Sequence, residues 1–218
     1  MRLHKTGHDI ADNVSDLIGE LPDGDYCIGY GILRHNLFSK GLWFEIDKGF
    51  WGSDHYSGNY RLSFCGTQPK FTEDAPQEPH GLTLEPWRRS GKYILVCPPT
   101  QPVCKFFNIG YTDWLMSATR QAGPSYFIRH KGMTEPIDWS KVSRVITFNS
   151  TVGIEALRRG IPVISDPDHS SIGSYAKNKG LDGYDREPLL SFLKAHMFKL
   201  FEKEKICQLI THYMTKKY

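Results

Sequence analysis

The feature that most constrains the fold is a regular alternation of short apolar runs with amphipathic segments in the second half of the chain. Helical patterns cover 112–121 and 152–159, and a short helical turn is expected at 139–142. Four apolar runs between them have the length of buried strands: 93–97, 125–129, 144–148 and 161–165. Strands joined through helices pair in parallel, so this rhythm predicts a doubly wound, Rossmann-like parallel sheet.

The first ninety residues predict a smaller α/β lobe. An amphipathic helix is expected at 9–21 because apolar residues recur there at helical spacing. Residues 66–91 contain four prolines and little periodicity, so we expect a long connection with a short helical or docking element at 82–87. Three short strands complete the lobe: 26–30, 42–46 and 59–64.

The tail, 187–214, reads as helical throughout, as one bent helix or two helices that fold back over the lobes. The predicted organisation is therefore a reduced N-terminal α/β lobe over 1–90, a Rossmann-like lobe over 91–184, and C-terminal helices over 185–218. The fold class is α/β, with Rossmann-like parallel sheets in both lobes and the C-terminal helices packed back on them.

Composition excludes several classes of protein. Apolar residues make up 39% and charged residues 23% of the 218 residues, which is typical of a globular chain. No segment approaches the ~20 apolar residues of a membrane span. The start of the chain has no apolar signal core, and the five cysteines form no CxxC pair, so we expect a cytoplasmic protein without a disulfide framework or metal site.

Charge argues against a broad nucleic-acid-binding face. The net charge of +3 is carried by residues 185–218, and the remaining chain balances to zero. A protein that binds nucleic acid over a wide surface concentrates basic residues on that surface.

Polar segments follow each strand of the predicted second sheet. They fall where ligands bind in open parallel sheets, beyond the carboxyl ends of the strands. We interpret the last, 166–168, as a turn. The segments are 98–100, 129–131, 149–151 and 166–168.

The strand and helix around residue 150 form the sharpest pattern. Ser150 and Thr151 stand at the start of a helix, where backbone amides and the helix dipole favour a phosphate. Gly153 allows a ligand or a strand to approach closely, and Glu155 could accept hydrogen bonds from ribose hydroxyls. The same residues also suit a capped strand–helix unit in which Ser150 caps the helix, and spacing alone leaves both interpretations open.

This segment resembles the donor-site motif of GT-B-type glycosyltransferases, including the capsule-polysaccharide transferase group. The resemblance is carried by Asn149-Ser150-Thr151, Glu155-Ala156-Leu157 and Gly160-Ile161-Pro162-Val163. It implies a nucleoside-diphosphate sugar as co-substrate, no cofactor and no metal. It also implies that Ser150 and Thr151 hold the diphosphate and that Glu155 binds the ribose. Related motifs occur in sugar-nucleotide epimerases of the same fold.

A basic turn one strand earlier also matches these enzymes, which often neutralise phosphate there. Its members are Arg129, His130 and Lys131. Stabilising a departing diphosphate without a metal requires such cations, so Arg129 and Lys131 are the candidates for that role.

The first lobe is similar to uncharacterised glycosyltransferase-like proteins of phages and bacteria. The similarity lies in 30–34, 46–51 and 60–63. It implies a glycan as acceptor or, for a phage protein acting in the host cytoplasm, a hydroxylated DNA base. The chain is shorter than a usual GT-B enzyme, so the acceptor lobe is expected to be reduced.

Glycosyl transfer needs a base to deprotonate the acceptor. Asp47 and His35 both follow predicted strands of the first lobe and are the candidates, although a turn aspartate and a surface histidine explain them too. Arg34, Trp51 and Arg61 are candidate acceptor-binding residues. Two alternatives stay open: a sugar-nucleotide epimerase or hydrolase of the same fold, and a non-catalytic nucleotide- or glycan-binding module.

Overall fold

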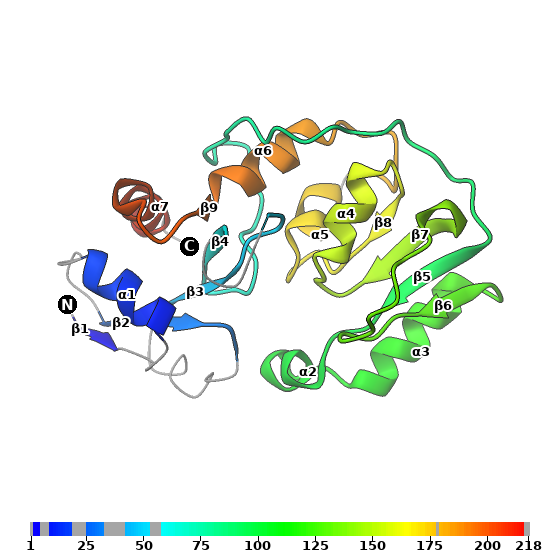
Figure 1. Ribbon diagram of the computed structural model, residues 1–218. Helices are drawn as coiled ribbons and strands as arrows, with labels where there is room; N and C mark the ends of the chain where they lie inside the picture. The colour runs from blue at the N-terminus through cyan, green and yellow to red at the C-terminus, as the bar shows by residue number, and fades with distance from the viewer. Residues whose placement is uncertain are drawn as a thin grey trace. The chain divides into compact units, whose positions relative to one another are not determined.

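The structure is a computed structural model that describes residues 2–4, 9–18, 25–32, 42–52, 58–177 and 179–215 (Figure 1). The chain forms two compact units. The first unit comprises Met1–Pro69, Pro76–Glu78 and Phe192–Tyr218, and the second comprises Lys70–Ala75 and Pro79–Ser191. The domain boundaries expected after residues 90 and 184 stay a prediction, because compactness does not show which parts fold independently.

The first unit is built on a mixed five-stranded sheet, here called the first sheet. β1, β2 and β3 pair in parallel, whereas β4 runs antiparallel to both β3 and β9. The strand order is β1-β2-β3-β4-β9. The strands are β1 (Arg2–His4), β2 (Asp25–Tyr30), β3 (Leu42–Lys48), β4 (Tyr60–Phe64) and β9 (Met197–Phe198).

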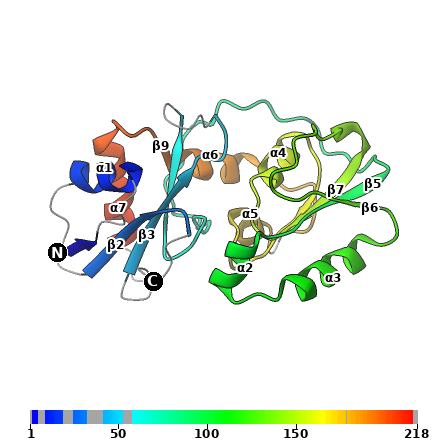
Figure 2. The same ribbon diagram turned by 60° about the horizontal axis from the view of Figure 1, so that its bottom comes forward.

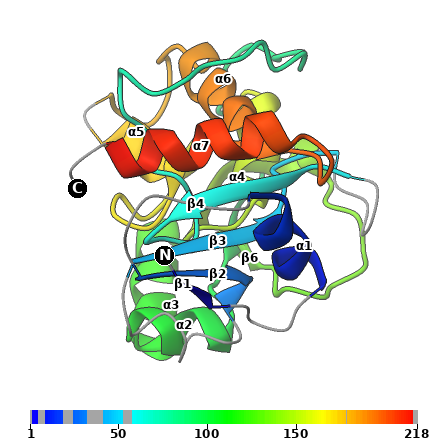
Figure 3. The same ribbon diagram turned by 90° about the vertical axis from the view of Figure 1, so that its left-hand side faces the viewer.

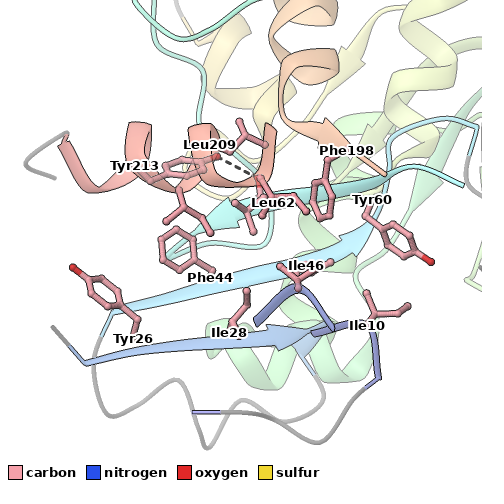
Figure 4. Packing of buried hydrophobic residues seen from close by; sticks show 13 residues of the cluster. Ile10, Tyr26, Ile28, Phe44, Ile46, Tyr60, Leu62, Phe198, Leu209 and Tyr213 are labelled. Carbon is pink, nitrogen blue, oxygen red and sulfur yellow. Dashed lines mark hydrogen bonds between the residues drawn. The ribbon is translucent and has the colours of Figure 1, made fainter. Parts of the chain in front are cut away.

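Two helices cover one face of the first sheet: α1 (Asp9–Ile18) and α7 (Lys203–Thr215) (Figure 3). Alternate residues of β3 and β4 point to this face, as the two-residue period of a strand requires. Phe44 and Leu62 are fully buried there, and the Tyr213 hydroxyl donates to the Leu62 carbonyl over 3.3 Å (Figure 4). The core of this unit therefore joins elements from both ends of the chain.

The second unit contains a four-stranded sheet in which every pair is parallel, here called the second sheet. Its strand order is β6-β5-β7-β8. Short apolar strands buried on both sides are typical of parallel sheets. The strands are β5 (Tyr93–Cys97), β6 (Tyr126–Ile128), β7 (Val142–Thr147) and β8 (Val163–Ile164).

Helices lie on both faces of the second sheet (Figure 2). α3 packs through Ala118 and Ala122 on Val96 and Ile146, and α4 packs on the opposite face. The unit is thus a three-layered, doubly wound α/β arrangement. Its helical elements are α2 (Gln101–Phe107), α3 (Tyr111–Ala122), the short 3-10 helix η2 (Trp139–Lys141), α4 (Val152–Arg158) and α5 (Ser171–Ala176).

The long connection before β5 docks on the second unit without forming a helix. Its backbone hydrogen-bonds to the end of α4, with the Glu85 amide donating to the Arg158 carbonyl and the Arg88 amide to the Gly160 carbonyl, each over 2.8 Å. Arg186 adds a hydrogen bond to the Glu85 carbonyl (2.7 Å). The expected docking element is confirmed, but a helix at 82–87 is wrong, because these backbone groups pair with α4 instead of with one another.

The α/β class and the parallel second sheet are confirmed. A parallel first sheet is wrong, because β4 returns antiparallel beside β3. The tail forms two helices, as one of the two expected arrangements has it, but α6 (Glu187–Ala195) and α7 are separated by an unexpected strand, β9, which pairs with β4. A two-residue strand whose partner lies far away in the sequence leaves no local pattern that could predict it.

Candidate functional site

The strand order of the second sheet places a topological switch point between β5 and β7. The chain leaves β5 toward β6 on one side and then crosses back to β7 on the other. In open parallel sheets, ligands bind in the crevice that this reversal leaves outside the carboxyl ends of the two strands. The segments that flank it here are Pro98–Thr100 after β5 and Phe148–Thr151 after β7.

Hydrogen bonds hold the turn after β7 in one conformation. The Thr147 hydroxyl donates to the Cys97 carbonyl over 3.0 Å, which ties the ends of β5 and β7 together. The Ser150 amide donates to the Thr147 hydroxyl oxygen (3.2 Å), and the Val152 amide to the Ser150 hydroxyl oxygen (3.3 Å). Ser150 therefore bonds the start of α4, as the capped-unit interpretation expects, and its hydroxyl proton can still be donated to a ligand.

Several amides at this turn already donate within the protein. The Gly153 amide donates to the Ser150 carbonyl and the Ile154 amide to the Thr151 carbonyl, each over 3.0 Å. Thr151 precedes α4, is exposed, and makes no side-chain cap hydrogen bond. The groups left to bind an anion are therefore mainly hydroxyls, with fewer free amides than the sequence pattern suggested.

Gly153 is explained by close packing of α4. A Cβ atom on this residue would lie 2.7 Å from the Ile172 side chain and 3.3 Å from that of Val163. The Ile172 and Val163 side chains would have to shift to make room for it, so glycine lets α4 lie this close to β8 and α5 without displacing them. Of the two explanations for this glycine, close approach of a protein element is the one that the contacts support.

Glu155 is half-buried and ion-paired within its own helix. Its Oε1 accepts from Arg159 (2.8 and 3.0 Å), and its Oε2 accepts from Arg158 (3.1 Å). These i,i+3 and i,i+4 pairs orient the carboxylate toward the end of α4. Binding of a ribose by Glu155 stays a prediction, and it would have to compete with both guanidinium groups.

The basic turn after β6 is organised by Arg129. Its guanidinium donates to the carbonyls of Glu135 (2.8 Å) and Met133 (2.9 Å), so it closes the loop 129–135. His130 and Lys131 are exposed in that loop. Arg129 thus shapes the turn, while Lys131 presents a charge to solvent. A phosphate contact from any of these residues stays a prediction.

The segment 166–168 after β8 was interpreted from sequence only as a turn, and the histidine that follows it was not singled out. His169 follows β8, and its Nδ1 lies 2.7 Å from Asp166 Oδ1. Its ring stacks on Phe148, with ring centroids 5.3 Å apart, and meets Phe107 of α2 edge-on at 4.4 Å. An aspartate three residues before a histidine, directly after a buried strand, was the signal that could have revealed this pair.

The first unit holds a second polar cluster, on the face of its sheet away from α1 and α7. Asp47 on β3 pairs with Arg61 on β4 through a 2.6 Å contact between Oδ2 and a guanidinium nitrogen. The Arg61 side chain is 7% exposed, also bonds the carbonyls of Lys48 and Thr67, and lies 5.1 Å from the centre of the Phe50 ring. Asp47 and Arg61 are therefore held together, which agrees with a structural pair as well as with a binding pair.

Glu45 belongs to the same cluster and was not singled out from the sequence. It lies opposite Ser63 in the β3–β4 register and is 2% exposed. Burial raises its carboxyl pKa to about 8, against an opposing effect of the Arg61 charge. Within the described part of the chain, three buried polar atoms of this cluster have no hydrogen-bond partner: Glu45 Oε2, Ser63 Oγ and Arg61 Nε. Alternation of Glu45 and Asp47 with apolar residues along β3 was the available signal.

The other residues predicted for the first lobe are only partly placed. Trp51 is partly buried and its ring lies 6.4 Å from that of Phe50. Arg34 and His35 lie outside the described residues. The described residues contain no group of three or more His, Cys, Asp or Glu that could hold a metal ion, and metal independence stays a prediction. No helix among them has the length and apolar character needed to cross a membrane.

Neither a known family model nor a curated protein matches the sequence. Among solved structures, the chain is similar to Thermosulfurimonas dismutans KpsC, a β-Kdo 2,7 transferase. The sequence identity is 15%, the match covers 85% of this chain and 85% of that chain, and the TM-score is 0.47. The likeness is distant, and it identifies neither a substrate nor an acceptor for this protein.

Proposed function

We propose that the protein is a glycosyltransferase that binds a nucleoside-diphosphate sugar at the carboxyl edge of the second sheet. The observation that carries the proposal is the switch point between β5 and β7, where a serine and a threonine follow the strand that precedes α4. A nucleotide is the ligand class that such edges accommodate in doubly wound folds. The resemblance of 149–163 to GT-B donor-site motifs narrows the ligand class to a sugar nucleotide.

In this proposal Ser150 and Thr151 donate their hydroxyl protons to the diphosphate. Lys131 in the exposed basic turn supplies positive charge as the diphosphate departs. Arg129 keeps that turn in shape through its two carbonyl contacts. Glu155 binds the ribose only if the ribose hydroxyls displace the Arg158 or Arg159 guanidinium from its carboxylate.

The acceptor side of the proposal belongs to the first unit. Asp47 and His35 are the proposed bases that take the proton of the acceptor hydroxyl. The acceptor is a glycan, with a hydroxylated DNA base as the second class. Asp47→Asn and His35→Gln should lower kcat and leave nucleotide affinity unchanged, because neither residue belongs to the unit that holds the donor site. A loss of nucleotide affinity in either variant would contradict this division of roles.

The donor site is tested by calorimetric titration of purified protein with nucleotide sugars and nucleoside diphosphates. Wild-type protein should bind at least one of them, and Ser150→Ala and Thr151→Ala should each weaken binding by about 5- to 10-fold, the typical loss of one hydrogen bond. The matched control is Ser125→Ala, an exposed serine at the amino edge of the same sheet. No binding by wild-type protein, or equal losses in the control, would refute the proposal.

Product analysis then separates transfer from the alternatives. A hydrolase releases free sugar and an epimerase changes the donor, and both act without an acceptor. A binding module leaves the donor intact under all conditions. Transfer requires that a labelled sugar appears on an added glycan or DNA acceptor.

A further inference from the structure

An aromatic cluster joins three segments at the carboxyl edge of the second sheet. Phe107 ends α2, which follows β5, while Phe148 follows β7 and His169 follows β8. Phe107 lies 5.5 Å from Phe148 and 4.4 Å from His169 between ring centroids. His169 stacks on Phe148 at 5.3 Å, with 28° between the ring planes. The imidazole therefore contacts both phenyl rings, stacked on Phe148 and edge-on to Phe107, at the edge where the switch point lies.

A carboxylate fixes the rotation of that imidazole. Asp166 Oδ1 lies 2.7 Å from His169 Nδ1 and also accepts the amides of Asp168 (3.0 Å) and His169 (2.9 Å). Because an ionised carboxylate only accepts, Nδ1 must carry a proton and donate it. Nε2 is then the ring nitrogen available to a ligand, and it makes no hydrogen bond within the described part of the chain.

The same segment is tied to the serine-bearing turn. The Asp166 amide donates to the Phe148 carbonyl over 3.1 Å, and the Ser165 hydroxyl donates to the same carbonyl over 2.8 Å. Ser150 stands two residues after Phe148. The His169 side chain is 36% exposed, so its ring is neither sealed in the core nor free in solvent.

A purely structural role for the imidazole is not required at this position. Ser170 supplies the side-chain cap of α5 by accepting the Gly173 amide, and Asp166 bonds two amides without involving the ring. The turn before α5 is thus closed by other groups. What the imidazole adds is an oriented nitrogen on a segment that hydrogen-bonds to Phe148, two residues before Ser150.

We infer that His169 binds a phosphate group of the nucleotide through Nε2 and that Asp166 positions its ring, an inference that rests on the proposed function. With Nδ1–H donated to Asp166, protonation at Nε2 gives an imidazolium whose charge the carboxylate balances. Nε2–H then donates a charge-assisted hydrogen bond to a phosphate oxygen. The Phe148 ring stacked on the imidazole and the Phe107 ring beside it lower the local dielectric, which strengthens that bond.

The test separates the phosphate contact from general damage to the fold. Uridine, cytidine, guanosine and thymidine diphosphates are titrated into wild-type protein, and the tightest is compared with its parent nucleoside by ligand-observed NMR. His169→Phe keeps a ring in the cluster and removes both nitrogens. It should weaken diphosphate binding by about tenfold or more, the loss typical of a hydrogen bond to a charged group, and change nucleoside binding by less than about twofold. Asp166→Asn should cause a smaller loss of the same kind.

A matched control is His212→Phe, which changes a histidine in the first unit and should leave both affinities unchanged. Equal losses for diphosphate and nucleoside in His169→Phe would show that the residue only supports the fold and would overturn the inference. Unchanged diphosphate affinity in His169→Phe would overturn it as well, while the donor-site proposal would stand. If wild-type protein binds none of the four diphosphates, both proposals fail together.

Discussion

Replacing Glu45 by glutamine tests how the buried polar face of the first sheet affects stability. Glutamine keeps the size of the side chain and removes its titration. In the native protein, burial raises the Glu45 pKa from 4.5 to about 8. In the unfolded chain the carboxyl ionises near its ordinary pKa. Between these values the folded protein binds one more proton than the unfolded chain, so its free energy of unfolding falls as pH rises.

The size of the effect follows from that interval. A proton bound only by the folded state changes the free energy of unfolding by about 1.4 kcal/mol for each pH unit. From pH 4.5 to about 8, the ceiling is on the order of 5 kcal/mol. The contribution of the Glu45 proton to the free energy of unfolding is fully present below pH 4.5 and is lost by about pH 8. Relative to wild type, Glu45→Gln should therefore gain at least about 2 kcal/mol between pH 5 and pH 8.

The assay is urea denaturation of both proteins at pH 5, 6, 7, 8 and 9. The free energy of unfolding should fall with urea concentration at the same slope for the two proteins, so that the difference between their urea midpoints reports the difference in stability. Glu204→Gln, an exposed glutamate of the same unit, is the control and should track wild type at every pH. A constant difference between wild type and Glu45→Gln across this range would refute the reasoning, because Glu45 would then ionise as it does in water.

Three further outcomes follow from the second unit and the cysteines. Gly160→Ala should destabilise the protein by more than about 2 kcal/mol in thermal or urea unfolding, because the φ of Gly160 is +66° and a Cβ would lie 1.9 Å from the Pro86 carbonyl oxygen. A variant as stable as the wild-type protein would contradict this. Arg186→Ala should cost about 2–4 kcal/mol by the same measurement, since a buried guanidinium that bonds two carbonyls is lost; a cost under about 0.5 kcal/mol would count against it. Iodoacetamide at pH 8 should label exposed Cys65 and spare Cys97, whose pKa burial raises to about 12; mass spectrometry showing equal labelling would disprove this.

The second unit was largely predictable because its pattern is local. Each strand from β5 to β8 is a short apolar run, and α3 and α4 have helical periodicity, so the parallel order follows from general rules of connection. The short helices α2 and α5 were missed. With seven and six residues they contain too few turns for a periodicity to stand out.

The first sheet was less predictable because its pairings are long-range. β9 completes it with residues 197 and 198, more than 130 residues after its partner β4. The antiparallel return of β4 also left no signal, since strand propensity does not specify direction. The burial of Glu45 could not be predicted for a similar reason. A strand pattern shows which residues share a face of the sheet but not whether other parts of the chain cover that face.

In the candidate site, too, the local features were predictable from the sequence and the contacts between distant residues were not. By itself, the sequence determined that polar segments follow the parallel strands and that Ser150 and Thr151 open a helix, because residue order and periodicity are properties of the chain. Only the tertiary structure decided that Gly153 serves helix packing and that His169 contacts both Phe107 and Phe148. Those outcomes depend on side chains that meet only after the strands have paired, and hydrogen bonding and packing between distant residues are not encoded in any local pattern.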